Sequence, residues 1–281
     1  MGRIRETLRA FKRIGMGHQP VWIEYPITFQ ARWETGNPYL AEIIGASAAR
    51  QQANLAALAA LMPVVEAIET KAYPDLAAID WHNGMLPALD ALSLMWAVSG
   101  AKTYMEVGSG NSTLFVRAAL RRFGKDTRIV SIDPAPRAEI DAICDEVIRQ
   151  PVENVDPAIF DRLEPGDVLF IDNSHRSFMN SDVTVCMTEV IPRLKPGVLV
   201  GVHDVFLPYD YPQAWRDWGY NEQYLLAAML LAGPSYLDIQ LANHWLYRQG
   251  AHIGPLAAIW ERLGERARDR PPSAFWAVKR G

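Results

Sequence analysis

Residues 103–113 read TYMEVGSGNST, and this stretch decides the fold. Its first five residues are a short apolar run ending in Val107, typical of a buried parallel strand, and Leu114 begins a run with helical spacing. Gly108 and Gly110 therefore lie in a turn between a strand and a helix. Because glycine has no Cβ and tolerates positive φ, such a turn brings its backbone close to a ligand and directs the free N–H groups of the helix N-terminus at it. The stretch predicts a nucleotide-type binding site.

The composition excludes several classes of function. The chain has 281 residues and a formal net charge of −4, which gives no general attraction to nucleic acid. Its two cysteines, Cys144 and Cys186, lie inside apolar patterns and are expected to be reduced core thiols, in keeping with a cytoplasmic location. No run reaches the roughly 18 apolar residues of a membrane span, and an apolar signal-peptide region is lacking.

Residues 3–15 form a basic segment, RIRETLRAFKRIG, with its apolar residues at helical spacing. Such a helix suits weak peripheral contact with a membrane surface. Docking on its own domain or on a partner subunit of a homodimer is the alternative interpretation.

The chain divides into an N-terminal helical cap or extension, residues 1–100, and an alternating domain, residues 101–281. Alternation of strands and helices predicts an α/β fold with a parallel sheet covered on both faces. A helix is expected from about Phe178 to Leu194. Strands are expected at residues 103–107, 128–133, 146–149, 167–173, 198–204, 236–242 and 273–279.

Polar residues follow several of these strands. Asp133 ends the second strand, Asp172 ends the fourth, and His203 and Asp204 end the fifth. In an open parallel sheet, ligands bind outside the carboxyl ends of the strands, where the strand order reverses. Asp133 is therefore placed to accept hydrogen bonds from both hydroxyls of a ribose.

The glycine motif lacks the third glycine of a dinucleotide fingerprint, because GSGNST carries Thr113 at that position. Read from Glu106, E-x-G-x-G-N-S-T resembles the first motif of class I S-adenosylmethionine-dependent methyltransferases. The resemblance implies a Rossmann-like, mostly parallel seven-stranded sheet whose last strand is antiparallel. It also implies that S-adenosylmethionine is bound by Glu106, Gly108, Ser109, Gly110, Ser112, Asp133 and Asp172.

A second pattern joins FIDNSHRSF at residues 170–178 with GVHDVF at residues 201–206. Together they resemble the divalent-metal-dependent small-molecule O-methyltransferases, which include cephalosporin-hydroxylase-like and rhamnosyl methyltransferase sequences. The resemblance implies that Asp172, His203 and Asp204 bind the metal and that His175, with Asp172, is catalytic. A bound dication lowers the pKa of the acceptor hydroxyl, and His175 takes the proton as general base.

The identity of the metal stays open. An imidazole in the place of His203 departs from the usual acid or amide, so Mg²⁺ competes with Mn²⁺, Fe²⁺ and Zn²⁺. His203 as a structural histidine, and His175 as a cap of the following helix, are the alternatives for these two residues.

The expected function is methyl transfer to a hydroxyl of a small sugar, polyketide or phenol. A metal-independent methyltransferase of the same fold and a non-catalytic cofactor-binding accessory protein are the alternatives. The aromatic stretch at residues 206–224 is predicted either to line the substrate site or to form a lid or dimer contact. Within it, Asp210 and Glu222 could orient hydroxyls of the substrate, but the favoured interpretation is that they are solvated loop residues.

Overall fold

The computed structural model describes residues 7–8, 11–12, 14–16, 28–76, 79–136 and 138–281. The chain forms two compact units, Met1–Gln30 and Ala31–Gly281, and the description below concerns the second. The predicted basic helix at residues 3–15 lies mostly outside the described residues, so its contact with a membrane or partner stays a prediction. None of the helices in the described ranges has the length and apolar character needed to cross a membrane.

A seven-stranded sheet forms the centre of Ala31–Gly281, with strand order β3-β2-β1-β4-β5-β7-β6. All pairs from β3 to β5 are parallel, whereas β7 runs antiparallel to both β5 and β6. The predicted α/β fold, with an antiparallel last strand, is confirmed. The strands are β1 (Thr103–Val107), β2 (Arg128–Ile132), β3 (Glu146–Ile148), β4 (Val168–Ile171), β5 (Leu199–Val202), β6 (Leu237–Ala242) and β7 (Phe275–Lys279).

The register aligns the carboxyl ends of the central strands. Val107 pairs with Ile132 of β2 and with Ile171 of β4, and Ile171 pairs in turn with Val202 of β5. The residues that follow these four strand ends therefore emerge at one edge of the sheet. The strand order reverses between β1 and β4, which is where parallel sheets bind ligands.

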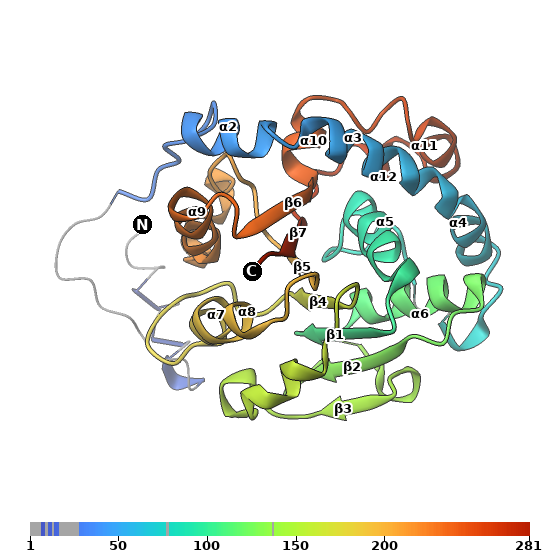
Figure 1. Ribbon diagram of the computed structural model, residues 1–281, viewed down its shortest axis with the longest axis horizontal. Coiled ribbons are helices and arrows are strands. Elements are labelled where there is room, and N and C mark those ends of the chain that lie inside the picture. Colours follow the sequence, from blue (N-terminus) through green and yellow to red (C-terminus); the bar gives the residue numbers. More distant parts are fainter. Residues whose placement is uncertain (1–6, 9–10, 13, 17–27, 77–78, 137) are drawn as a thin grey trace. The chain divides into compact units, whose positions relative to one another are not determined.

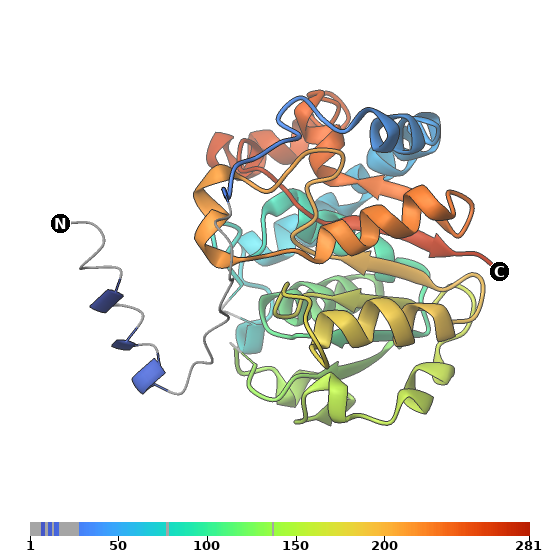
Figure 2. The same cartoon turned by 90° about the vertical axis from the view of Figure 1, so that its left-hand side faces the viewer.

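Helices cover both faces of the sheet, with α7, α8 and α9 on one side and α4, α5 and α6 on the other (Figures 1 and 2). The two faces carry separate apolar clusters. The principal helices are α2 (Pro38–Gly45), α3 (Ala48–Ala57), α4 (Met62–Glu69), α5 (Ala88–Ala97), α6 (Asn111–Phe123), α7 (Asp182–Val185), α8 (Ile191–Arg193), α9 (Glu222–Ala232), α10 (Asn243–Arg248), α11 (Ala257–Leu263) and α12 (Glu265–Arg268).

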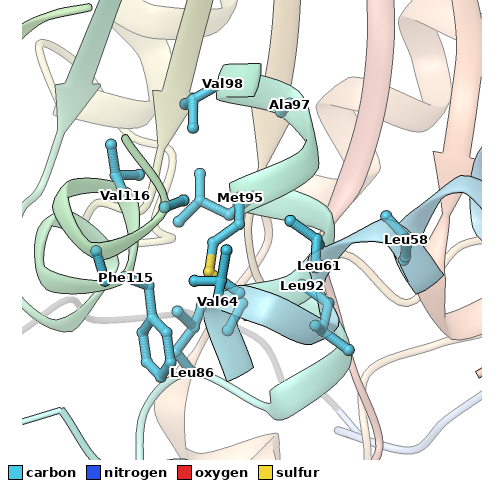
Figure 3. Packing of buried hydrophobic residues seen from close by; sticks show 14 of the residues in the cluster. Leu58, Leu61, Val64, Leu86, Leu92, Met95, Ala97, Val98, Phe115 and Val116 are labelled. Carbon is cyan, nitrogen blue, oxygen red and sulfur yellow. The ribbon is translucent and has the colours of Figure 1, made fainter. Parts of the chain in front are cut away.

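The predicted cap helices pack directly on the sheet domain. Figure 3 shows side chains of the segment from Leu58 to Val64 and of α5 meeting Phe115 and Val116 of α6. Leu92 and Phe115 are almost fully buried there, and burying a side chain of this size contributes about 1.5–3 kcal/mol. These contacts belong to the single compact unit Ala31–Gly281, and a division of the chain at residue 100 stays a proposal.

The helix predicted from about Phe178 begins later, at Asp182. Ser181 caps it by accepting a hydrogen bond from the backbone N–H of Thr184, which makes residue 182 the first helical position. A π-helical segment, Cys186–Val190, then separates α7 from α8. As a result, residues 172–181 form a loop that is free to carry polar side chains over the edge of the sheet.

Candidate active site

The glycine turn after β1 needs glycine for reasons of space. Gly108 has a φ of 82°, and a Cβ at this position would lie 1.9 Å from the backbone carbonyl oxygen of Asp172. The backbone of the turn after β1 therefore packs directly against the backbone at the end of β4. Gly110 also has a positive φ, of 156°, and its N–H donates to the hydroxyl of Thr113. The residue that replaces the third glycine therefore closes the turn with its side chain.

Glu106 stabilises the glycine turn through hydrogen bonds with residues at the start of α6. Its buried carboxylate accepts hydrogen bonds from the hydroxyls of Tyr104 (2.8 Å), Ser112 (2.9 Å) and Thr113. Burial raises the pKa of Glu106 to about 7, against the opposing effect of the three hydroxyls. The residue joins β1 to the first turn of α6 and does not line the cavity described below. It supports the ligand-binding turn through Ser112 and Thr113.

Asp133 follows β2 and is held rigidly by backbone groups. One carboxylate oxygen accepts from the N–H of Ser109 (2.7 Å), and the other accepts from the N–H of Ala135 (2.8 Å). Arg149 donates to the backbone carbonyl of Asp133 at 2.9 Å. This is the fixed carboxylate that the sequence predicted for binding ribose hydroxyls.

A cavity of about 410 Å³ opens at this edge of the sheet. Six of the seven residues predicted to bind the cofactor line it, Glu106 being the exception. They are Gly108, Ser109, Gly110, Ser112, Asp133 and Asp172.

Glu153 is among the cavity residues that sequence reasoning missed. Glu153 lies just beyond β3, lines the cavity, and has a buried Oε2 atom without a hydrogen-bond partner. A buried acceptor of this kind calls for a donor from a ligand. The signal available in the sequence was an acid shortly after the third strand.

Asp172 also belongs to a group of four side chains, here named the acid–imidazole cluster: Asp172, His175, His203 and Asp204. Nε2 of His175 lies 3.4 Å from Asp172 Oδ1 and 3.3 Å from Asp204 Oδ2. Nδ1 of His203 lies 3.4 Å from Asp172 Oδ1 and 3.5 Å from Asp204 Oδ1. The structure therefore brings together all four residues that the second pattern predicted.

Two further carboxylates contact the outer nitrogens of the two rings. Glu222 hydrogen-bonds to Nδ1 of His175, and Asp90 lies 3.3 Å from Nε2 of His203. Both carboxylates are fully buried. The expectation that Glu222 is a solvated loop residue is therefore wrong, because α9 begins at this residue and turns its first side chain inward. His175 does not cap a helix either.

The charges in the cluster support one another. Burial alone would lower the pKa of His175, but Glu222, Asp172 and Asp204 outweigh it and raise the pKa well above the ordinary value. Burial likewise opposes the charge of Asp172, but His203 and His175 lower its pKa. Burial raises the pKa of Glu222 to about 6, against the effect of His175.

The backbone of the cluster is strained at two positions. His175 has a φ of 62° and Asp204 a φ of 54°, in the left-handed region that non-glycine residues rarely adopt. Such conformations concentrate at functional sites because the surrounding structure must hold them in place. The strain is consistent with side chains positioned for chemistry at both residues.

The predicted metal ligands Asp172, His203 and Asp204 meet in this cluster, and their binding of a metal ion stays a prediction. Within the part of the chain that the structure describes, no group of three or more histidine, cysteine, aspartate or glutamate side chains could hold one. The two rings instead lie at ion-pair distance from the carboxylates.

Comparison with known proteins gives a match to a protein family and likenesses to solved structures. Residues 105–205 match the family described as a methyltransferase domain, a segment that runs from β1 to just beyond β5. The chain is similar to the O-methyltransferase TomG from Streptomyces achromogenes, which is involved in tomaymycin synthesis and was crystallised in complex with SAM. The two chains are 15% identical, with a TM-score of 0.35 over 89% of this chain and 98% of TomG. A similarity this low does not support an assignment of function. No curated protein matches the chain.

Proposed function

We propose that this chain, a class I S-adenosylmethionine-dependent methyltransferase, transfers the methyl group to a hydroxyl oxygen of a small molecule. The observation that carries the proposal is the position of Asp172. Its side chain is 28% exposed and lines the cavity, while the same carboxylate contacts both histidines. The methyl donor in the cavity and the proton acceptor His175 would therefore both lie next to Asp172.

The cavity supports the cofactor assignment through its polar groups. Asp133 would accept from the ribose hydroxyls, and the unpaired oxygen of Glu153 would accept from the exocyclic amine of adenine. The turn from Gly108 to Gly110 lines the cavity and would lie against the amino-acid portion, while its own N–H groups donate to Ile132, Asp133 and Thr113. When bound, S-adenosylmethionine supplies an electrophilic methyl group on a sulfonium.

The cluster supports a hydroxyl as the acceptor. A hydroxyl is a weak nucleophile and must lose its proton as its oxygen takes the methyl group, so it needs a proton acceptor beside it. Asp172 would orient the hydroxyl by accepting its hydrogen bond, and Nε2 of His175 would take the proton as general base, a role worth about 10²–10⁴-fold. The surrounding carboxylates raise the pKa of His175 and so favour its imidazolium form, which means that the ring acts as the base only in molecules in which Nε2 has first lost its proton.

Metal assistance stays a prediction from the sequence. The steps above use side chains alone. The metal-independent version predicts that turnover survives treatment with EDTA and is not raised by adding back Mg²⁺, Mn²⁺ or Zn²⁺. Loss of turnover in EDTA, restored by one of these ions, would establish the metal-assisted version.

Calorimetry with S-adenosylmethionine, S-adenosylhomocysteine and NAD, measured side by side, tests the cofactor. We expect heat of binding with the first two and none with NAD, and binding of NAD alone would overturn the assignment. The acceptor is tested with sugars, phenols and their amine analogues, followed by mass spectrometry and NMR of the product. Methylation of nitrogen would overturn the hydroxyl proposal, and cofactor binding without turnover would favour the accessory protein.

A further inference from the structure

Each histidine of the acid–imidazole cluster has a carboxylate against its outer ring nitrogen. Both carboxylates lie outside residues 105–205, the segment that matches the methyltransferase family. Glu222 is the first residue of α9, and Asp90 lies in the first turn of α5. Each carboxylate is 0% exposed. Burying a charge is costly unless it is paired, so packing alone would favour an apolar side chain at either position.

Glu222 is dedicated to His175. Its Oε1 hydrogen-bonds to Nδ1 of the ring, whereas its Oε2 is buried without a partner. The start of α9 is tied to the same loop, since the N–H of Asn221 donates to the carbonyl of His175 at 2.9 Å and the side chain of Asn221 accepts from Ser177 at 2.6 Å. An ionised carboxylate only accepts hydrogen bonds, so Nδ1 must carry a proton and Nε2 becomes the nitrogen that faces Asp172.

Asp90 is the counterpart for His203. Its two oxygens accept from Asn243 (2.8 Å) and from the backbone N–H groups of Ser273 (2.7 Å) and Ala274 (2.9 Å). The remaining contact, at 3.3 Å, is to Nε2 of His203. This contact places a proton on Nε2 and turns Nδ1 toward Asp172 and Asp204.

We propose that Glu222 and Asp90 are positioning residues, each of which holds a proton on the outer nitrogen of one imidazole and sets the orientation of the ring so that its inner nitrogen faces Asp172 and Asp204. The consequence for the methyl transfer rests on the proposed function, because Glu222 would present Nε2 of His175 as the base. The orientation itself follows from the contacts alone. It makes α5 and α9 part of the active site.

The orientation is tested by NMR of protein labelled with ¹⁵N-histidine, without substrate, in the wild type and in the variants Glu222→Met, Glu222→Gln and Asp90→Asn. His175→Gln and His203→Gln assign the two rings. We expect Glu222→Met to change the ring-nitrogen shifts of His175 and leave those of His203 in place, and Asp90→Asn to do the reverse. Unchanged ring shifts in both Glu222→Met and Asp90→Asn would overturn the proposal, as would equal changes in both rings in either variant.

Steady-state kinetics then measure the effect on turnover. We expect Glu222→Met to lower kcat about a hundredfold while KM for S-adenosylmethionine stays within about threefold, because the base is lost but the cavity is intact. Glu222→Gln keeps an acceptor oxygen and should recover at least about tenfold of that loss. A joint change in kcat and KM, or no recovery in Glu222→Gln, would indicate a structural role and contradict the proposal.

Matched controls lie on the same two helices. Gln223 on α9 and Ser93 on α5 are buried polar residues that hydrogen-bond to neither ring. The side chain of Gln223 accepts from the N–H of Phe206 and donates to the carbonyl of Tyr209. The hydroxyl of Ser93 accepts from Asn243 and Trp276 and donates to the backbone carbonyl of Asp90, not to its carboxylate. Gln223→Ala and Ser93→Ala should leave the histidine spectra and kcat near the wild type. If the rings are oriented as proposed but no hydroxyl is methylated, the proposed function fails and the positioning role stands.

Discussion

The cofactor cavity and the acid–imidazole cluster share Asp172, but they are built from different material. Backbone groups and short side chains that follow β1 and β2 line much of the cavity, which has a volume of about 410 Å³. The cluster consists of charged side chains from distant segments, and His175 and His203 are only 4% and 2% exposed. One region is a preformed space, and the other is a closed network that meets that space at a single carboxylate.

This difference separates binding from chemistry. An open space lined by backbone donors recognises a ligand by shape and hydrogen bonds, and changes there should alter affinity. A closed network of paired charges fixes proton positions, and changes there should alter turnover with little effect on affinity. Substitutions in the two regions should therefore give opposite signatures in kcat and in the binding constant.

The largest effect is expected from Gly108→Ala, because the new Cβ would lie 1.9 Å from the carbonyl oxygen of Asp172 and must push β1 and β4 apart. Both regions meet at this point, so cofactor binding and turnover should both fall by more than about a hundredfold. Calorimetry and a turnover assay measure the two quantities.

Gly124→Ala is the matched control for this substitution. Gly124 also has a positive φ, of 59°, but a Cβ there would meet nothing within 4 Å. We expect a cost of about 1 kcal/mol in stability and normal cofactor affinity. Similar losses of affinity in the two variants would show that backbone strain, and not the close approach to Asp172, is responsible.

The next effect concerns the cluster alone. His175→Ala should cut turnover at least about a hundredfold, because the base is removed, while the affinity for S-adenosylmethionine stays near normal. His82→Ala, in an exposed loop, should change neither quantity. Unchanged turnover in His175→Ala would remove this residue from the mechanism and break the contrast between the two regions.

The same contrast explains what could be predicted from the sequence. The cavity follows from local signals: the glycine turn lies within a few residues of β1, and Asp133 directly follows β2. Strand ends of a parallel sheet meet at one edge, so the meeting of Asp172, His175, His203 and Asp204 could be predicted as well. The sheet could be predicted because β4 and β5 are short apolar runs and β1 is mostly apolar.

The orienting carboxylates could not be predicted in this way. Glu222 lies 47 residues from His175 along the chain, and Asp90 lies 113 residues from His203. Both contacts depend on how a helix packs on the sheet, and helical periodicity does not specify that packing. Glu222 also follows an aromatic loop that looks solvent-exposed in the sequence, so its full burial was missed. The later start of α7 depends on the choice of Ser181 as the cap.

A smaller effect is expected from Asp133→Asn in the cavity. The substitution removes a charge that accepts two backbone N–H bonds and is proposed to bind the ribose, and hydrogen bonds to charged groups contribute about 1.5–3 kcal/mol. Affinity for S-adenosylmethionine should fall about tenfold to a hundredfold, with kcat at saturating cofactor close to normal. Asp126→Asn, an exposed acid before β2, is the control. A lower kcat with unchanged affinity would show that Asp133 acts in the chemical step and not in cofactor binding.

The smallest effect, a shift of a few degrees in Tm, concerns Glu106, which supports the cavity from below. Burial raises the pKa of this carboxyl to about 7 in the folded protein, from 4.5. At pH values between about 4.5 and 7, the carboxyl of Glu106 is ionised in the unfolded chain but protonated in the folded protein. Glu106 therefore lowers the free energy of unfolding as pH rises through this range, and its contribution no longer changes at higher pH. Glu106→Gln cannot ionise, so its Tm relative to the wild type should rise over this window and then level off. The exposed Glu261 gives the control Glu261→Gln, whose Tm difference should not follow this course. A Tm difference for Glu106→Gln that is flat between about pH 4.5 and 7, and falls with rising pH only below about 4.5, would mean that the three hydroxyls outweigh burial and hold the carboxylate ionised.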